Sequence, residues 1–137
     1  MVYQPPMIHE LRVIFGDTDQ MGVVYYANYL RFFEAARAAF WRDLGRSHRD
    51  LEAWNVALPV VTAHCDYRAP ARYEDLLAIE VDVSELRSAS MRFAYKVRCE
   101  DRLLAEGYTR HAVIDAGNGR VCGLPRELRQ VLERRTV

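Results

Sequence analysis

One segment of the sequence has the periodicity of a long helix with a broad apolar surface. Between about Asn28 and Leu44, apolar residues recur at spacings of three or four, and Gly45 follows as a stop signal. Four more apolar residues widen this stripe, namely Leu30, Phe32, Ala39 and Trp41. A helix that is apolar over so much of its circumference has to be largely enclosed. The segment therefore predicts a fold in which other elements wrap around one central helix.

The other long segments have the period of strands. Apolar and polar residues alternate before the helix and in four segments after it, which indicates strands with one buried face. The predicted strands are residues 8–15, 61–69, 77–84, 91–98 and 103–115. The connections between the later strands are too short for crossover helices, so we expect neighbouring strands to run antiparallel. This order predicts an α+β fold in which an antiparallel sheet curls around the helix.

Two local features and the chain length refine this prediction. Gly107, in the last predicted strand, is expected to mark a β-bulge. The segment "PRELRQVLERR" predicts a short closing helix with Pro125 in its first turn. With 137 residues, half of them apolar, the chain suffices for one hydrophobic core, and we expect a single domain over residues 1–137.

The charge and composition argue against several classes of partner. Formal net charge is zero and acidic and basic residues are mixed, so no surface-wide field favours nucleic acid or an anionic membrane. No apolar run approaches the roughly 20 residues that a membrane-spanning helix needs, and the N-terminus lacks the pattern of a signal peptide. The three cysteines form no C-x-x-C pair, so we expect reduced core residues in a cytoplasmic protein.

Polar residues concentrate between the first strand and the helix, in "GDTDQMGVVYYANY". These residues could simply form turns, because aspartate side chains bond their own backbone and Gly22 permits positive φ. The segment also matches the start of a calcium-binding EF-hand loop. However, Met21 and Asn28 stand where that loop needs an oxygen ligand and a bidentate glutamate. No histidine lies near enough in sequence to suggest zinc or iron, so we expect no metal site.

The same junction carries the groups that acyl transfer needs. A carboxylate precedes the helix, and the first amides of a helix lack intrahelical acceptors and carry the positive end of its dipole. Such amides can stabilise a developing oxyanion. The carboxylate can attack an acyl carbonyl directly or activate a water as a general base, and both roles stay open.

The segment "RVIFGDTDQMGVVYYANYLRFFEAAR" resembles the signature of the 4-hydroxybenzoyl-CoA thioesterase family of hotdog-fold enzymes. The similarity extends through "PVVTAHCDYRAPARYEDLLAIEV" and covers most of the chain. This resemblance implies a sheet wrapped around a central helix, and homo-oligomers, dimers or tetramers, with the active site between two subunits of a dimer. It also implies hydrolysis of a small aromatic or short-chain acyl-CoA to the acid and free CoA. CoA is then part of the substrate, and no cofactor is expected.

The resemblance also implies roles for residues of the junction. Asp19 is expected to be the catalytic carboxylate, and the backbone N–H of Tyr26 to polarise the thioester carbonyl. Gly22 is expected to let the loop close over the site. The expected helix start moves from an N-cap at Asn28 to about Tyr25.

The first aspartate of the motif, Asp17, is expected to shape the loop by bonding its amides. One acid suffices for the chemistry, and two ionised carboxylates close together repel each other.

The acyl group could be bound by Glu34, because the 4-hydroxybenzoyl enzyme uses an acid at this helix position to bind the ring hydroxyl of its substrate. The alternative is that Glu34 pairs with Arg31 or Arg37 on the same helix. In the branch associated with the Tol-Pal system, a histidine typically stands at the position of Tyr26, whereas the aromatic acyl-CoA branch carries tyrosine. Here Ala27 follows, where the 4-hydroxybenzoyl enzyme has proline, so the acyl group stays open.

The CoA arm needs donors for its phosphates. The segment "LRSAS" matches the family segment that meets the CoA arm, so Arg87, Ser88 and Ser90 are candidates. Because this segment holds one basic residue, Arg72 or Arg134 of a neighbouring subunit could supplement it.

The remaining histidines in predicted strands are assigned no catalytic role, and two rival functions stay open. His64 and Cys65 are adjacent on a predicted strand, so their side chains point to opposite faces and cannot form a catalytic pair. His111 lies on a strand without an obvious partner, and a structural role is expected. Two rival functions are a thioesterase for acyl carrier protein substrates and a non-catalytic acyl-CoA-binding protein.

Overall fold

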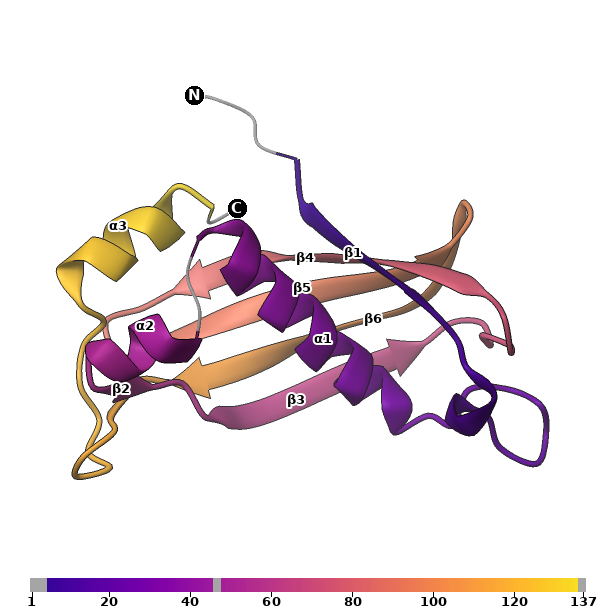
Figure 1. Cartoon of the computed structure of the whole chain (residues 1–137), viewed down its shortest axis with the longest axis horizontal. Helices are drawn as coiled ribbons and strands as arrows, with labels where there is room; N and C mark the ends of the chain where they lie inside the picture. The colour runs from indigo at the N-terminus through magenta and orange to yellow at the C-terminus, as the bar shows by residue number, and fades with distance from the viewer. Residues whose placement is uncertain (1–4, 46–47, 136–137) are drawn as a thin grey trace.

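The main feature of the structure is a five-stranded antiparallel sheet with the strand order β1-β4-β5-β6-β3. The computed structural model describes residues 5–45 and 48–135. The strands of this sheet are β1 (Met7–Arg12), β3 (Val60–Tyr67), β4 (Leu76–Leu86), β5 (Ser90–Cys99) and β6 (Arg102–Ala112). A separate short pair joins β2 (Val56–Ala57) to β7 (Ile114–Asp115). The predicted antiparallel sheet is confirmed, and Figure 1 shows its strands side by side.

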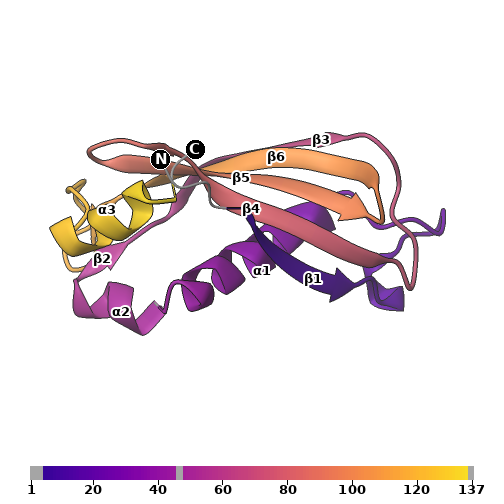
Figure 2. The same cartoon turned by 90° about the horizontal axis from the view of Figure 1, so that it is seen from above.

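The long helix α1 (Asn28–Asp43) lies along one face of this sheet, as Figure 2 shows from above. The ring of Phe33 stacks on Tyr95 of β5 with 4.3 Å between centroids, and Phe40 meets Phe93 edge-on at 5.1 Å. The predicted helix is confirmed to within one residue. Its buried residues are Tyr29, Phe32, Phe33, Ala36, Ala39 and Phe40.

The opposite side of α1 is open. Leu30 is 42% exposed, and Glu34 and Ala38 are also exposed. The prediction that the helix is largely enclosed is therefore wrong for this side, because the sheet of one chain covers only the other side.

Shorter elements cover one end of the sheet. The closing helix α3 (Arg126–Glu133) is confirmed; it buries Leu128 and Leu132, and Pro125 is its N-cap, one residue before the predicted first-turn position. The sequence did not predict α2 (His48–Ala53) or the β2–β7 pair, which are too short to show a period. In the described parts of the chain, no helix has the length and apolar character to cross a membrane.

The first strand is shorter than predicted. It ends at Arg12 instead of continuing to residue 15, and a 3-10 turn, η1 (Phe15–Asp17), follows. The reason is a local competition: the carboxylate of Asp17 accepts the amide of Ile14 at 3.0 Å, which turns the chain out of the sheet.

Gly107 does not mark a bulge, since it pairs in regular register with Cys65 on one side and Tyr95 on the other. A Cβ atom at this position would lie 2.0 Å from the carbonyl oxygen of His64. The glycine therefore permits a close approach of β6 to β3. The irregularity in the β5–β6 pairing lies instead between Val97 and Arg98.

Candidate active site

The segment between β1 and α1 forms a closed loop, at the right of Figure 1. The amide of Tyr25 donates to the carbonyl of Asp17 at 2.9 Å, and the amide of Asp19 donates to Val23 at 2.9 Å. The turn at the tip of the loop passes through Gly22, whose φ is 79°. A positive φ of this size favours glycine, so the predicted turn role of Gly22 is confirmed.

Asp17 holds this loop together. Its side chain is 6% exposed and pairs with Arg31 of α1 through Oδ1, while Oδ2 accepts the amide of Ile14. The carbonyl of Asp17 accepts both the amide of Tyr25 and the side-chain Nδ2 of Asn28, each at 2.9 Å. The geometry therefore agrees with the predicted loop-shaping role of Asp17. Asn28 uses its side chain for the bond to Asp17, so this side chain does not cap the helix.

Asp19 is partly exposed and has one oxygen engaged in the loop. Its Oδ1 accepts the amide of Met21 at 2.8 Å, which is the Asx-turn arrangement. Its Oδ2 has no hydrogen-bond donor among the residues that the structure describes. Asp19 thus acts as a turn residue and also presents a carboxylate oxygen that is available to a ligand.

The start of α1 leaves backbone amides available. The helix begins at Asn28, with Ala27 as an N-cap that makes no side-chain bond. The N-cap predicted at Asn28 is therefore one residue too late, and the start at about Tyr25 that the resemblance implies is three residues too early. A turn leads into the helix, in which Asn28 donates to the carbonyl of Tyr25 at 2.9 Å and Tyr29 to that of Tyr26 at 3.3 Å. Within the described part of the chain, the amides of Tyr26 and Ala27 have no acceptor. These two amides carry the positive end of the helix dipole.

An aromatic cluster surrounds this turn. Tyr26 is 62% exposed, and its ring meets Tyr67 of β3 edge-on at 6.2 Å between centroids. Tyr67 also meets Tyr29 at 5.2 Å, and its hydroxyl donates to the carbonyl of Tyr26 at 2.9 Å. Burial, followed by the neighbouring Cys65, raises the pKa of Tyr67 to about 12. Tyr67 was not predicted as a site residue, because the sequence shows only a tyrosine at the end of an alternating strand.

Glu34 is exposed on α1. The alternative in which it pairs with Arg31 or Arg37 is wrong, because Arg31 bonds Asp17 and Arg37 donates to the hydroxyl of Tyr95 at 3.0 Å. Among the described residues, Glu34 has no ion pair or hydrogen bond. Its carboxylate is therefore available to a ligand or a second chain.

The CoA-arm candidates lie at the other end of the sheet. The start of β4 is beside the junction, since the amide of Val13 donates to the carbonyl of Asp75 at 2.9 Å. Arg87 follows the far end of β4, an eleven-residue strand, which at about 3.3 Å per residue spans roughly 35 Å. Ser88 lies in the same turn and Ser90 begins β5, at the left of Figure 1. One chain therefore does not bring these residues to Asp19.

The guanidinium of Arg87 already has a partner. Its Nε lies 2.6 Å from Oε1 of Glu85, and the carbonyl of Arg87 accepts a bond from Arg129 of α3. This pairing reduces its free positive charge, although the side chain is exposed.

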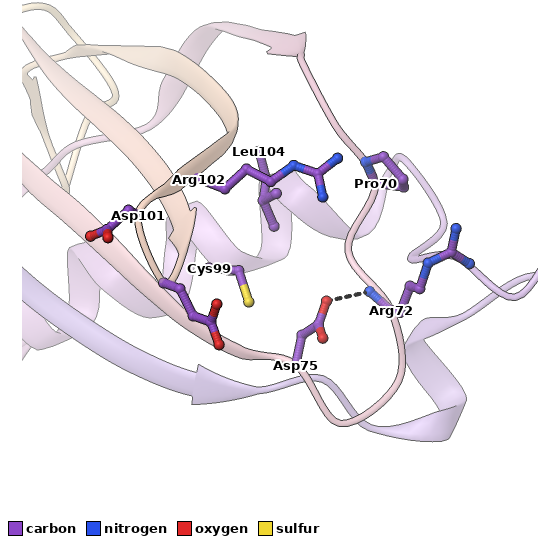
Figure 3. A pocket seen from close by; sticks show the side chains of 8 residues that line it. Pro70, Arg72, Asp75, Cys99, Asp101, Arg102 and Leu104 are labelled. Carbon is purple, nitrogen blue, oxygen red and sulfur yellow. Dashed lines mark hydrogen bonds between the residues drawn. The ribbon is translucent and has the colours of Figure 1, made fainter.

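An open hollow lies at the junction end of the sheet (Figure 3). In its wall, the backbone amide of Arg72 donates to Oδ2 of Asp75 at 2.8 Å. Three acids and two arginines line it, so it has no net positive charge for an anion; the lining residues are Pro70, Arg72, Asp75, Cys99, Glu100, Asp101, Arg102 and Leu104. Neither Asp19 nor Tyr26 is among them, and we do not place the chemistry there.

A second polar group of residues is buried between α1 and the sheet. The hydroxyl of Tyr95 lies 2.6 Å from Oγ1 of Thr109, which lies 2.8 Å from Nε2 of His111. Nδ1 of His111 lies 2.9 Å from the carbonyl oxygen of Leu58. At the other end of this series of bonds, Arg37 donates to the hydroxyl of Tyr95. The prediction that His111 has no obvious partner is therefore wrong, but its buried position agrees with the expected structural role.

His64 bonds Asp66 on the exposed face of β3, with 3.0 Å between Nε2 and Oδ2. Cys65 packs against the hydrophobic core on the other face of the strand, so the two neighbours form no catalytic pair, as predicted.

An antiparallel sheet against one long helix, with a carboxylate loop before that helix, defines a hotdog-fold protein of the thioesterase type. The chain belongs to the thioesterase-like superfamily, which matches residues 13–132.

Similar proteins include several that are named as thioesterases. The acyl-CoA thioesterase YbgC of Haemophilus influenzae is 35% identical over 120 residues, 87% of this chain and 88% of that protein. A solved structure of a hypothetical protein from Aquifex aeolicus has a TM-score of 0.87 and 32% identity, covering 93% of this chain and 99% of the other. The structure of the gentisyl-coenzyme A thioesterase BH1999 has a TM-score of 0.83 and 28% identity, covering 92% and 99%.

Proposed function

We propose that the protein hydrolyses an acyl-CoA thioester to a carboxylic acid and free CoA. One observation carries this proposal: the free Oδ2 of Asp19 and the free amides of Tyr26 and Ala27 belong to one closed loop at the start of α1. The names of two relatives, an acyl-CoA thioesterase and a gentisyl-coenzyme A thioesterase, support the same substrate class.

In this mechanism, the amide of Tyr26 donates to the carbonyl oxygen of the thioester while negative charge develops on it. Asp19 either attacks the carbonyl carbon or removes a proton from an attacking water. In both routes the C–S bond breaks, and the thiolate of CoA leaves and takes up a proton. Direct attack leaves an anhydride between the acyl group and Asp19, which water cleaves to release the acid and restore the carboxylate. In the other route the attacking water itself supplies the oxygen of the acid. The overall reaction consumes only thioester and water, so we propose that no metal or redox cofactor takes part.

We further propose that the active unit is a homo-oligomer, a dimer or tetramer, with the site between two subunits. Two observations support this. First, β3 is an edge strand with no partner strand on one side among the described residues, and Val60 and Val61 on it are exposed by 46% and 58%. Second, Arg87 lies too far from Asp19 within one chain to share its substrate.

The acyl group is proposed to be small and aromatic or short-chain. The exposed rings of Tyr25 and Tyr26 offer apolar contact beside the free amides, and the unpaired carboxylate of Glu34 could accept a bond from a ring hydroxyl. The protein is proposed to be cytoplasmic, which fits three cysteines that form no disulfide.

A thiol-release assay tests this function. Benzoyl-type, phenylacetyl and aliphatic CoA esters are compared with the same acyl groups on an acyl carrier protein. We expect hydrolysis of CoA esters, with a preference among acyl groups. Faster turnover of the carrier-protein substrates would favour the first rival function. Tight binding of acyl-CoA without thiol release would favour a non-catalytic binding protein.

A further inference from the structure

The hydroxyl of Tyr67 reaches across from the sheet to the first turn before α1. It donates to the carbonyl oxygen of Tyr26 at 2.9 Å, and the same carbonyl accepts the amide of Tyr29 at 3.3 Å. Tyr67 is the last residue of β3, so this bond ties the end of an edge strand to the turn that carries the free amides.

The peptide groups of this turn are held one after another. The amide of Tyr25 donates to Asp17, and the carbonyl of Tyr25 accepts the amide of Asn28, each at 2.9 Å. The carbonyl of Tyr26 is held by Tyr67. Every peptide group from residue 24 to residue 27 therefore has one end fixed, while the amides of Tyr26 and Ala27 are left without a protein acceptor in the described residues. Fixed donors of this kind need no reorganisation when charge develops in front of them.

We propose that Tyr67 is a positioning residue for the hydrolytic reaction: its hydroxyl holds the carbonyl of Tyr26, and with it the turn whose free amides, those of Tyr26 and Ala27, face the thioester oxyanion. The proposal rests on the proposed function, because it assumes that these amides stabilise the oxyanion. Tyr67 contacts no reacting atom in this account and acts only through the turn.

A tyrosine suits this task for two reasons. Its ring is fixed by edge-on contacts with Tyr26 and Tyr29, at 6.2 and 5.2 Å between centroids, so the hydroxyl is held in place. The raised pKa of about 12 keeps the phenol protonated, so the hydroxyl stays a donor throughout the working range of the enzyme. A donor on the carbonyl side of a peptide also polarises the N–H on its other side, here that of Ala27.

The kinetic test compares Tyr67→Phe with Tyr108→Phe. Phenylalanine keeps the ring contacts of Tyr67 and removes its hydroxyl, with the bond to the carbonyl of Tyr26 and the contact with the thiol of Cys65. Tyr108 is the matched control, because its ring is held by His64 at 5.3 Å and by Arg92, and its hydroxyl has no hydrogen bond to any described residue. We expect Tyr67→Phe to lower kcat about tenfold with KM within twofold of the original, a smaller effect than the roughly 100-fold loss on deleting an oxyanion donor. Tyr108→Phe should change neither constant by more than about twofold.

A second readout is independent of activity. In ¹⁵N-labelled protein, Tyr67→Phe should shift the amide resonances of Tyr26 and Ala27, whereas Tyr108→Phe should leave them in place. Unchanged kcat and unchanged amides in Tyr67→Phe would overturn the positioning role while hydrolysis by the original protein still supports the function. Shifted amides with full kcat would also overturn it. If the original protein hydrolysed no thioester, the proposed function would fail and the positioning role of Tyr67 in that reaction with it, even with the amide shifts preserved.

Discussion

Two polar regions of this protein contrast in how their hydrogen bonds are used. In the buried series of bonds from Arg37 to His111, the hydroxyls of Tyr95 and Thr109 and the ring of His111 are bonded to one another or to Leu58. Nδ1 of His111 must carry the proton, because its partner is the carbonyl of Leu58, so Nε2 accepts from Thr109. Thr109 then accepts from the hydroxyl of Tyr95, which accepts from Arg37. The side chains of Tyr95, Thr109 and His111 therefore use their bonding capacity within the core.

The loop before α1 has the opposite property. Its residue types look less catalytic than a histidine, a tyrosine and a threonine in contact, yet it leaves one carboxylate oxygen of Asp19 and the amides of Tyr26 and Ala27 unbonded to any described residue. Buried polar groups with complete bonding stabilise a fold. Accessible groups held in place with bonding capacity left over can stabilise a transition state instead. The contrast predicts that changes in one region alter stability and changes in the other alter turnover.

The largest effect is expected from Asp19→Asn. Asparagine still accepts the amide of Met21, so the loop keeps its turn and only the charge is lost. We expect kcat to fall by at least about 100-fold, with the free energy of unfolding in urea unchanged within about 0.5 kcal/mol. Asp101→Asn, in the exposed β5–β6 turn, is the control and should keep full activity. Near-normal turnover of Asp19→Asn would remove the basis for the proposed mechanism.

Thr109→Val should have the reverse profile. Valine keeps the shape of the side chain but removes the hydroxyl that bonds Tyr95 and His111, which leaves two buried polar groups without their partner. Urea denaturation should show a loss of about 2 kcal/mol, while kcat at 25 °C stays within about threefold, a change of less than 1 kcal/mol in the barrier. A loss of activity without a loss of stability would place this buried chain in the catalytic machinery.

The pH dependence of stability sharpens the same contrast. Burial lowers the pKa of His111 below its ordinary value of 6.5, partly opposed by its bond to Leu58. The folded state therefore favours the neutral ring, so this stabilisation is complete above about pH 6.5 and is lost as the pH falls through the lowered pKa. The free energy of unfolding should fall on acidification with a slope of at most about 1.4 kcal/mol per pH unit.

Two histidine variants test whether His111 causes this pH dependence of stability. His111→Gln should flatten the pH dependence between pH 7.5 and 5, whereas His64→Gln should preserve it, because His64 is exposed on β3. An equal pH dependence in the original protein and His111→Gln would show that another group titrates.

The smallest effect is expected from Glu34→Gln. Because Glu34 bonds no described residue, removing its charge should leave stability unchanged. If it binds a ring hydroxyl, KM for a hydroxybenzoyl-type CoA ester should rise about fivefold, the equivalent of one net hydrogen bond. KM for an aliphatic CoA ester should not change, and equal effects on both esters would argue against this contact.

The parts of the fold that were predictable have long, regular periods. The helix at residues 28–43 and the strands β4 to β6 bury apolar residues over many positions. The edge strand β3 was predicted from the same alternation, but most of it is exposed, so the buried face predicted for it is wrong. The short pair β2–β7 and the helix α2 are too brief to show a period, so tertiary contacts determine them. The role of Gly107 could not be predicted from the residue type. The sequence suggested a bulge, but the glycine is needed because the carbonyl of His64 approaches it closely.

The candidate site divides in the same way. The sequence alone determined the local chemistry, because a turn at Gly22, a carboxylate at Asp19 and the amides at a helix start depend on neighbours within a few residues. Only the tertiary structure decided which groups are bonded and which stay free. The partners of His111, the bond from Tyr67 to Tyr26 and the separation of Arg87 from Asp19 all join segments distant in sequence, and periodicity along the chain does not report such contacts.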